Sequence, residues 1–448
     1  MEEAKAYIQT FGCQMNEHDS QRMAEVLASS GYEITQTLED ASLIVINTCS
    51  VRHNPENKVY SMLGRLRTLK QSNPDLIIGV GGCVAQQEGE RILQREKTVD
   101  MVFGPDNCFR LPEMIDRVRA GERVLMTQWQ PKPADRVVNF IPDEWVERGH
   151  VEGCKAYIAI TKGCDNFCTF CIVPRTRGRE VSREPDNILR EARDLASRGA
   201  REIWLLGQNV NSYRAGGWGF LELLDAVSRV EGVLRIRFTS PHPNDWDNAL
   251  SDLMAARPTI CKQLHLPFQA GSDRILDLMN RRHTIADYLD KVRYLQSVAP
   301  DVELSTDLIV GFPSETDADF EQTLRVLEEV RFGQVFSFMY SPRPGTRAAR
   351  LHDDVPPPVK EERLQRVIAL QDRINNEKMA TYVGTEQDVL IDAAHPRERG
   401  VMNGRTDSYR PVSVRGDFEI GDIVPVRVVG FHGHWLEAEA ADVAAPRA

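Results

Sequence analysis

The sequence predicts an α/β protein in three parts: an N-terminal parallel α/β domain, a central partial (β/α)6 barrel and a small C-terminal antiparallel β-barrel. Three observations predict this fold class. Ile- and Val-rich runs alternate with helical patterns in the first part, six such runs appear in the second, and the third contains short alternating strands separated by turn residues. The predicted domain boundaries are 3–120, 150–380 and 383–445.

Composition limits the class of protein. The 448 residues are 42% hydrophobic and 27% charged, which is ordinary for a globular chain with two or three cores. The net charge of −11 argues against nonspecific coating of nucleic acid, although a local basic face can still bind a phosphate backbone. No apolar run approaches the ~20 residues that span a bilayer, and the N-terminus lacks an export signal, so a soluble cytoplasmic protein is expected.

In the first domain, three apolar runs each end in a cysteine. KAYIQTFGC, SLIVINTCS and LIIGVGGC end at Cys13, Cys49 and Cys83, and helical patterns such as SQRMAEVLASSGY, with Gly31 as a helix stop, separate them. The carboxyl ends of parallel strands meet at one edge of a sheet, so the three thiols are expected to converge.

The chain is expected to be irregular between about 125 and 150, where MTQWQPKPADR and FIPDEW lack periodicity. Six strand-like runs then follow between 157 and 340: YIAIT, EIWLLG, LRIRFTS, QLHLPF, VELSTDLIVGF and QVFSFMYS. Helical patterns between most of them predict an open (β/α) barrel, whose chemistry belongs on the loops after the strands.

VPPPVK ends the barrel pattern, and KEERLQRVIALQDRINNEKMATYV predicts one amphipathic helix. From about 383 to 442 the runs DVLIDAA, VSVRG, DIVPVRVVG and HWLEAEA predict the strands of the C-terminal barrel, and the tail AADVAAPRA is expected to fray.

A cysteine triplet lies directly after the first barrel strand. Cys164, Cys168 and Cys171 stand in KGCDNFCTFCIVPRTRGRE. A 4Fe-4S cube takes one thiolate per iron, so three thiolates leave one iron open to a ligand. The alternative is a structural zinc knot, which would need a fourth ligand that this loop does not supply. Phe167 and Phe170 would shield a cluster from water.

Cys13, Cys49 and Cys83 again supply three thiols, which suggests a second cluster with one open iron. The alternative is three unrelated buried cysteines. Nine cysteines in a protein without an export signal favour metal ligation over disulfides. Cys108, Cys154 and Cys261 share no spacing with either set and are interpreted as packing or surface thiols.

The triplet spacing resembles the radical S-adenosylmethionine (SAM) superfamily. With FGCQMN, NTCSVR and GGC upstream and a β-barrel downstream, the whole chain resembles the methylthiotransferase family. QTFGCQMNEHDS and CDNFCTFCIVPRTRGRE are closest to the branch that modifies dimethylallyl-adenosine in tRNA. Arg175 stands where a tyrosine is common in that branch.

The resemblance implies an activity and its cofactors. The triplet would hold the 4Fe-4S cluster that cleaves SAM, and Cys13, Cys49 and Cys83 would hold an auxiliary 4Fe-4S cluster. SAM would serve as both methyl donor and radical source in converting N(6)-dimethylallyladenosine at position 37, next to the anticodon, to its 2-methylthio derivative. The implied partners are the tRNA anticodon stem-loop, an electron donor such as a flavodoxin or ferredoxin, and sulfur and cluster delivery proteins. No membrane contact is expected, and the chain is expected to be a monomer.

Loops after later strands would bind SAM by the same resemblance. They contain Gly207, Gln208, Asn209, Ser240, Pro241, His242, Gln269, Ala270, Gly271, Ser272 and Asp307. Taken alone, Gly207 and Gly271 fit plain turns, and His242 or His265 fits a packing role.

The C-terminal barrel resembles the TRAM module, which binds RNA. The proposed RNA contacts are Arg397, Arg399, Arg405, Arg410 and Arg415, with Tyr409, Phe431 and Trp435 nearby. Arginines beside aromatics suit phosphates and splayed bases, and a solvated arginine face is the alternative. Arg175, Arg177, Arg179 and Arg183 would extend that path or balance the charge of a cluster.

Other readings stay open at this point. The substrate could instead be threonylcarbamoyl-adenosine in tRNA or an aspartate of a ribosomal protein. The chain could also be an iron–sulfur electron carrier, an RNA-binding sensor without turnover, or a zinc-bound RNA-binding protein.

Overall fold

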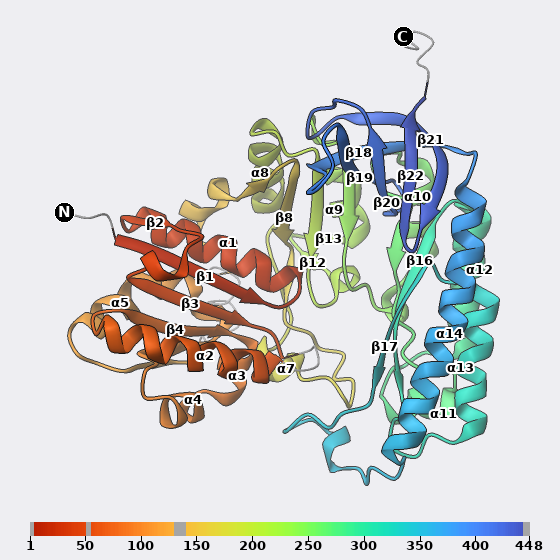
Figure 1. Ribbon diagram of the computed structural model, residues 1–448. Coiled ribbons are helices and arrows are strands. Elements are labelled where there is room, and N and C mark those ends of the chain that lie inside the picture. The colour runs from red at the N-terminus through yellow and green to blue at the C-terminus, as the bar shows by residue number, and fades with distance from the viewer. Residues whose placement is uncertain (1–3, 51–54, 130–139, 442–448) are drawn as a thin grey trace.

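The computed structural model describes residues 4–50, 55–129 and 140–441, which form three parts side by side (Figure 1). The N-terminal part is a six-stranded parallel sheet in the order β2-β1-β3-β4-β5-β6. Its strands are β1 (Ala4–Phe11), β2 (Tyr32–Ile34), β3 (Leu43–Thr48), β4 (Ile77–Gly82), β5 (Met101–Phe103) and β6 (Val124–Met126). The predicted parallel sheet is confirmed, and β2, β5 and β6 escaped prediction because three residues carry no readable periodicity.

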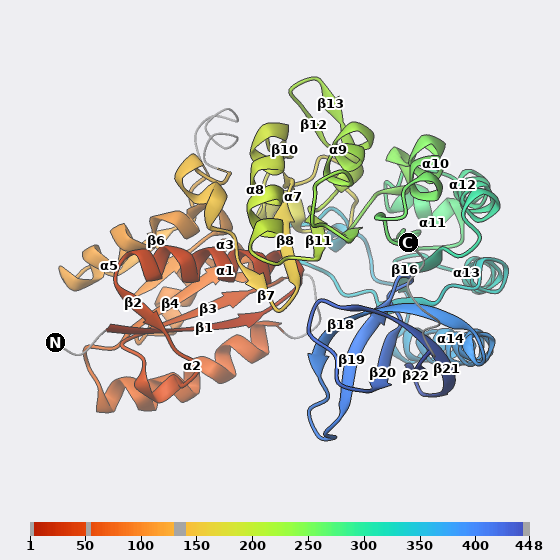
Figure 2. The same cartoon turned by 90° about the horizontal axis from the view of Figure 1, so that it is seen from above.

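Helices cover both faces of this sheet (Figure 2). On one face lie α1 (Gln14–Ser29) and α5 (Leu111–Arg119), which pack Met23, Leu27 and Met114 against the strands. On the other lie α2 (Pro55–Ser72) and α4 (Glu90–Arg95), which pack Leu63 and Ile92. The short helices η1 (Leu38–Asp40), α3 (Cys83–Glu88) and η2 (Pro105–Arg110) complete the domain.

The segment expected to be an irregular linker contains regular elements where the structure describes it. It begins inside β6, so the N-terminal sheet extends past residue 120. It ends in the short helix η3 (Asp143–Arg148), where Phe140, Ile141 and Val146 are buried. Most of MTQWQPKPADR lies outside the described residues. Phe140, Ile141 and Val146 pack with residues of both domains, so their spacing follows an interface and shows no helical or strand period.

The central part is an open barrel of six parallel strands. They are β8 (Lys155–Ala159), β11 (Glu202–Leu206), β14 (Arg235–Phe238), β15 (Gln263–His265), β16 (Glu303–Val310) and β17 (Gln334–Met339). A parallel bridge between Ile236 and Ile260 joins its two sheets. All six predicted strands are confirmed. The helices are α8 (Pro185–Ser197), α9 (Phe220–Val227), α10 (Asn248–Ala256), α11 (Asp273–Leu278), α12 (Ile285–Val298) and α13 (Asp317–Val330).

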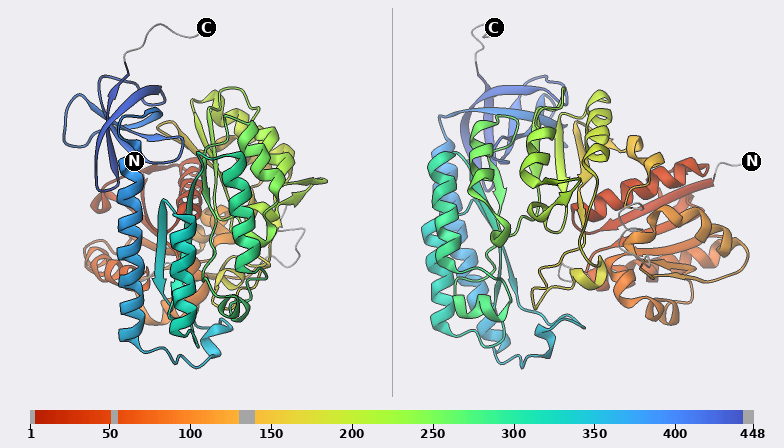
Figure 3. Two further views of the ribbon diagram at one scale, coloured as in Figure 1. Left: turned by 90° about the vertical axis from the view of Figure 1, so that its right-hand side faces the viewer. Right: turned by 180° about the vertical axis from the view of Figure 1, so that it is seen from behind.

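Smaller elements decorate the barrel. They are β7 (Val151–Glu152), β9 (Thr161–Lys162), α7 (Val173–Thr176), β10 (Val181–Ser182), η4 (Val210–Ser212), β12 (Arg214–Ala215), β13 (Trp218–Gly219), η5 (Pro243–Asp245) and η6 (Ala348–Arg350). The predicted long helix is α14 (Pro357–Tyr382), which lies along β17 and leads to the C-terminal barrel (Figure 3).

The C-terminal part is a closed five-stranded barrel. Its strands are β18 (Glu386–Ala394), β19 (Val401–Thr406), β20 (Pro411–Arg415), β21 (Ile423–His432) and β22 (Trp435–Ala440). The predicted β-barrel is confirmed with two differences. β19 (VMNGRT) was missed because its Asn and Gly are typical of turns. The barrel is also not wholly antiparallel, because β20 and β22 pair in parallel.

The C-terminal barrel docks on the amino ends of the central strands, opposite the cysteine loop that follows β8. Lys155 Nζ lies 2.5 Å from Asp392 Oδ2. Arg235 donates to the carbonyls of Arg405 and Asp388 over 2.6 and 2.7 Å. Figure 1 shows the barrel at the top of the molecule and α7, which follows the cysteine loop, in the lower half. No helix in the described part of the chain is long and apolar enough to cross a membrane.

A buried charge network joins the N-terminal and central parts. Arg22 of α1 and Arg183 both donate to the carboxylate of Glu191 on α8, and all three side chains are at most 2% exposed. A buried carboxylate between two guanidinium groups is stabilising only while both partners remain, because a lone buried charge has lost its hydration.

We expect Glu191→Gln to lower the free energy of unfolding by about 3 to 5 kcal/mol, because it leaves the buried Arg183 without a counter-charge and Arg22 with Glu25 alone. The measurement is denaturant unfolding followed by circular dichroism. Asp194→Asn is the matched control on the same helix. Its partner Arg198 lies four residues along and is 41% exposed, so a loss below about 0.5 kcal/mol is expected. Equal losses in both variants would contradict the role of the network.

Candidate active site

The three strand-end cysteines meet at one edge of the N-terminal sheet. Phe11 pairs with Thr48, and Thr48 pairs with Gly82, so these strand ends form one row across β1, β3 and β4. Cys13, Cys49 and Cys83 follow this row directly. The thiols of Cys13 and Cys49 are hydrogen-bonded to each other, and the charge of Cys13 acts on Cys83. The structure therefore brings together the three cysteines that the sequence placed far apart.

Two asparagines that sequence reasoning missed fix this edge. Asn16 Nδ2 donates to Asn47 Oδ1 and to the carbonyl of Thr48 over 3.2 and 3.1 Å. Asn47 Nδ2 donates back to the carbonyl of Asn16 over 2.7 Å. Both side chains are fully buried, so they hold the loop after β1 against the end of β3. Their positions inside FGCQMN and NTCS were the available signal.

Gly82 explains how the backbone turns into Cys83. Its φ is +90°, and a Cβ there would meet Thr48 O at 2.4 Å. Only glycine combines this left-handed conformation with so close an approach. Cys83 thereby becomes the first residue of α3 at the sheet edge.

Arg177 controls the electrostatics of this edge. The hydrogen bond with Cys49, followed by the nearby Arg177, lowers the pKa of Cys13 to about 6 against the opposing effect of burial. Burial raises the pKa of Cys83, although Arg177 opposes that shift. Arg177 is only 3% exposed and comes from the central domain, just after α7. Its Nη2 lies 2.7 Å from Asp19 Oδ2 of α1.

The second cysteine set lies in a loop whose two ends are held together. Gly163 has φ +82°, and a Cβ there would meet Arg179 O at 2.2 Å. The backbone N–H of Cys164 donates to Gly178 O over 3.2 Å. Arg281 donates from Nη1 to Cys168 Sγ over 3.5 Å and from Nη2 to Pro267 O over 2.6 Å. This buried arginine, which sequence analysis did not single out, fixes the middle cysteine.

The thiols of the triplet act on one another. Burial, followed by the charge of Cys168, raises the pKa of Cys171 to about 12. Burial raises the pKa of Cys164 to about 12 as well. Without a metal the thiols of Cys164 and Cys171 are protonated near neutral pH, and a metal must displace their protons to bind.

Among the described residues, no group of three or more His, Cys, Asp or Glu side chains is arranged to hold a single metal ion. A 4Fe-4S cube binds each thiolate to a different iron, so its ligands stand farther apart than those of one tetrahedral zinc ion. The three-thiol donor sets and the arginines beside them fit a cluster better than a closed zinc site.

Loops after β11 and β14 place unsatisfied polar atoms beside the cysteine loop. Gln208 Oε1 accepts a hydrogen bond from the N–H of Gly163 over 2.5 Å, next to Cys164. Gln208 Nε2, Asn209 Oδ1 and His242 Nε2 are buried and have no partner. Since buried polar groups are normally hydrogen-bonded, these three atoms fit a polar ligand at this end of the barrel.

His283, a further residue that the sequence did not indicate, lies beside His242, with ring centroids 6.0 Å apart. Its Nε2 is also buried and has no partner. Burial, and then the charge of Arg281, lowers the pKa of both His242 and His283, for His283 to about 4. Both rings are therefore neutral at neutral pH. His242 Nδ1 accepts from the N–H of Asn244, so its Nε2 carries the proton and can donate, whereas His283 Nδ1 donates to the carbonyl of Arg281, so its Nε2 can accept.

The remaining predicted cofactor residues are placed differently. Gly207 packs so tightly that a Cβ would meet Thr161 Oγ1 at 2.0 Å. Ser240 and Gln269 have positive φ values of 55° and 71° at strand ends. Ser272 donates to Asp319 over 2.5 Å and therefore faces α13. The structure thus gives Ser272 a partner within the protein.

Asp307 lies on the inner face of β16. Its Oδ2 is 3.4 Å from His265 Nε2, and it pairs across the sheet with Phe336 of β17. Phe336 and Phe338 are 42% and 36% exposed, which is unusual for strand phenylalanines. The inner face of the barrel therefore presents an aromatic surface with one acidic side chain.

The five arginines proposed for RNA binding do not share one environment. Arg397, Arg399 and Arg415 are exposed. Arg405 stacks on Tyr409, with Cζ 4.8 Å from the ring centre. The prediction that Arg410 contacts RNA is corrected, because its side chain is 6% exposed and donates to Asn375 and Glu303 over 2.8 and 3.2 Å.

The aromatic neighbours differ too. Tyr409 packs against Trp204 with ring centroids 5.1 Å apart, so it belongs to the interface between the barrels. Phe431 is half-buried, and Trp435 is 40% exposed. Periodicity could not distinguish arginines that hold the two barrels together from arginines that face solvent.

The four arginines that follow the triplet also differ in exposure. Arg175 and Arg179 are exposed, and Arg179 pairs with Asp165 at 2.6 Å. Arg177 and Arg183 are buried between domains.

Cys108, Cys154 and Cys261 lie away from both sets. All three are buried, and burial raises their pKa values, for Cys108 to about 12 and for Cys154 to about 11. Cys154 donates to the carbonyl of Ile391 over 3.5 Å and so serves the interface between the barrels. Their surroundings agree with the packing interpretation.

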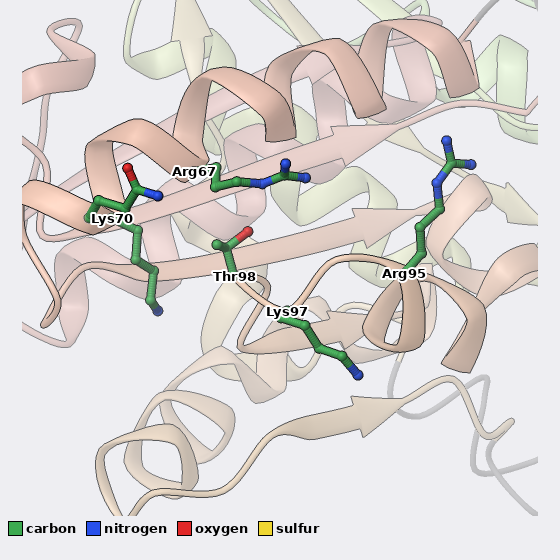
Figure 4. A pocket seen from close by; sticks show the side chains of 6 residues that line it. Arg67, Lys70, Arg95, Lys97 and Thr98 are labelled. Atoms are coloured by element: carbon green, nitrogen blue, oxygen red, sulfur yellow. The ribbon is translucent and has the colours of Figure 1, made fainter.

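A cavity of about 380 Å³ on the N-terminal domain is lined by Arg67, Lys70, Gln71, Arg95, Lys97 and Thr98 (Figure 4). Several of its cations already have partners. Arg67 pairs with Glu96 at 2.9 Å, and Lys70 with Asp100 at 2.5 Å. Arg95 stacks on Tyr60 at 3.8 Å. This charge compensation gives no reason to place the chemistry there.

In the iron-free protein, we expect Cys13 to react with iodoacetamide much faster than Cys108 at pH 7.5. Only the thiolate reacts, and Cys13 is half-buried with a pKa of about 6, whereas Cys108 is 4% exposed with a pKa of about 12. The rate at Cys13 should fall as the pH drops through 6. Mass spectrometry of the tryptic peptides measures both rates. A rate at Cys13 that still rises between pH 7 and 9 would contradict the assignment.

Comparison with known families now adds to this geometry. The model described as uncharacterized protein family UPF0004 matches residues 5–104, the radical SAM superfamily matches 158–327, and the TRAM domain matches 380–441. In fold, the chain is similar to a radical S-adenosylmethionine methyltransferase, TsrM, from Kitasatospora setae. The TM-score is 0.57 at 15% identity, over 78% of this chain and 77% of that one.

Two curated relatives align over almost the whole chain. A tRNA-2-methylthio-N(6)-dimethylallyladenosine synthase of Hahella chejuensis is 45% identical over 98% of both chains. One of Syntrophobacter fumaroxidans is 46% identical over 97% of this chain and 95% of its own. At this identity and coverage, the chain belongs to the tRNA-2-methylthio-N(6)-dimethylallyladenosine synthase family.

Proposed function

We propose that this protein is a radical SAM methylthiotransferase that converts N(6)-dimethylallyladenosine at position 37 of tRNA to its 2-methylthio derivative. The observation that carries the proposal is the pair of three-thiol sets on facing elements, in a chain that aligns end to end with synthases of this name. The N-terminal set lies next to Arg177, which itself belongs to the segment that follows the triplet. The helices α3, which begins at Cys83, and α7, which follows the triplet, are in contact, so the two sets lie on neighbouring elements.

The match to the radical SAM superfamily implies a 4Fe-4S cluster and SAM. Cys164, Cys168 and Cys171 would hold that cluster, and Cys13, Cys49 and Cys83 a second one. When bound, these groups supply one-electron cleavage of SAM and a place for sulfur, which the C2–H of adenine requires because it is too weakly acidic for a side-chain base. Three thiols per set leave a coordination position for a ligand that is not a cysteine.

The chain's own residues would bind SAM and orient the cysteine loop. Gln208, Asn209 and His242 offer buried polar atoms without partners beside the triplet, where they would bind the polar groups of SAM. Arg281 holds Cys168 through a hydrogen bond to its sulfur. His242 and His283 are neutral, so they contribute hydrogen bonds without adding positive charge next to the sulfonium of SAM.

The inner face of the barrel suits the substrate base. Phe336 and Phe338 provide exposed rings on which a splayed purine and its dimethylallyl group would pack. Asp307 offers a carboxylate beside them. An apolar substituent fits this surface better than the charged threonylcarbamoyl group of the alternative tRNA substrate.

The C-terminal barrel would bind the anticodon stem-loop of the tRNA. Arg397, Arg399 and Arg415 remain exposed for phosphates. Turnover also requires electrons and sulfur that this chain does not provide, so the proposal includes an electron-donor protein such as a flavodoxin or ferredoxin and proteins that deliver sulfur and clusters.

Anaerobic reconstitution should load about eight irons per wild-type chain and about four in each triple variant, C13A/C49A/C83A and C164A/C168A/C171A. Iron and sulfide counting measures this. The control variant C108A/C261A removes two buried cysteines outside both sets and should keep about eight irons. Wild-type protein with only about four irons would refute the second cluster.

The reconstituted wild type, given SAM, a reductant, sulfide and prenylated tRNA, should yield 2-methylthio-N(6)-dimethylallyladenosine on nucleoside mass spectrometry. Neither triple variant should form it. If the methylthio group appeared only on threonylcarbamoyl-adenosine or on a ribosomal protein, the substrate assignment would be wrong and the cluster assignment would stand.

Affinity for tRNA should fall with salt, and the R397Q/R399Q/R415Q variant should reduce the slope of log K against log salt concentration by about two. The reason is that each phosphate contact releases counterions from the RNA on binding, so a variant with fewer contacts releases fewer counterions. A matched variant, R229Q/R293Q/R373Q, removes the same charge from surface positions outside the C-terminal barrel, where each arginine is about 60% exposed. Equal slopes for the two variants would place the RNA elsewhere.

A further inference from the structure

Arg177 is buried at the boundary between two domains. It caps α7 through its N–H to Val173 O over 2.8 Å, and its side chain then points away from its own domain. The guanidinium lies 2.7 Å from Asp19 Oδ2 on α1 and is hydrogen-bonded to Cys83. An arginine buried to this degree is expensive unless it is paired, so its position is fixed by specific partners.

The charges around it are nearly balanced in the metal-free protein. Asp19 is its direct partner, and Lys162 forms a separate buried pair with Asp106 at 2.6 Å. His18 beside Asp19 is buried, and burial lowers its pKa, so it adds no positive charge at neutral pH. Three thiolates at Cys13, Cys49 and Cys83 would add negative charge next to Asp19, which is itself an anion, so a nearby cation is needed to offset it. Arg177 is a cation that acts on both Cys13 and Cys83.

We infer that Arg177 is a positioning residue for the auxiliary cluster, supplied by the central domain, which holds Cys83 and sets the reduction potential of the cluster held by Cys13, Cys49 and Cys83. This inference rests on the proposed function, because it requires that cluster. Hydrogen bonds and positive charge near the sulfurs favour the reduced, more negative state of an iron–sulfur cluster. Asp19 acts in the opposite direction by compensating the guanidinium.

The test uses the full-length chain carrying C164A/C168A/C171A, so that only the auxiliary cluster remains. Redox titration followed by electron paramagnetic resonance gives its midpoint potential. Arg177→Met should lower the reduced-to-oxidised ratio at a fixed potential at least tenfold, about 59 mV for a one-electron couple. Arg177→Lys should restore part of that loss, because it returns the charge without the planar hydrogen-bonding geometry.

Asp19→Asn should shift the potential in the opposite direction, because it removes the negative charge and leaves Arg177 in place. Arg179→Gln is the matched control, since Arg179 stands two residues away, is exposed and pairs with Asp165. It should leave the potential and the spectrum unchanged.

The outcomes distinguish a failure of the role of Arg177 from a failure of the auxiliary cluster site itself. A midpoint potential in Arg177→Met equal to that of Arg179→Gln would overturn the inference. If Arg177→Met takes up no iron, the sign of the Asp19→Asn shift decides, and no shift there would overturn it. If the parent triple variant itself takes up no iron, the proposed auxiliary site fails and the inference falls with it.

Discussion

Paired charges buried between the N-terminal and central domains are the constraint on which the candidate site depends. Arg22, Arg183 and Glu191 form one such group, and Arg177 with Asp19 forms another. The pairs Arg22–Glu191 and Arg177–Asp19 each take one partner from each domain. Arg183 holds Glu191 in place from within the central domain. Because separating the domains would break the buried pairs Arg22–Glu191 and Arg177–Asp19, the two cysteine sets keep one relative position. A purely apolar interface of the same area would allow the two domains to slide relative to each other.

The sequence predicted the architecture well where periodic patterns are long. All six barrel strands and the helix α14 were found, because each carries a readable apolar period. The misses have physical causes. β5 and β6 are three residues long, and β19 contains Asn and Gly that are typical of turns. The sheet order β2-β1-β3-β4-β5-β6 follows from tertiary pairing, which no single sequence displays.

The candidate site shows the same division. Both cysteine sets were visible in the sequence because cysteine is rare and strand ends are easy to locate. Asn16, Asn47, Arg281 and His283 were not, because ordinary polar residues gain meaning only when their neighbours are known. Arg410 shows the converse error. It stands in an arginine-rich stretch but is buried against Glu303, where it ties the C-terminal barrel to β16.

The docking of the C-terminal barrel on the amino ends of the central strands places it at the opposite end from the cysteine loop. β16 alone has eight residues, which corresponds to about 26 Å at ~3.3 Å per residue. A nucleoside, or an RNA of a few bases, can occupy one end of this span but never both. The distance between the two ends of the fold would then set the minimum length of an RNA that can contact both. Two weak contacts combine into one strong one only for a molecule long and stiff enough to reach across, so length itself becomes a criterion of selection.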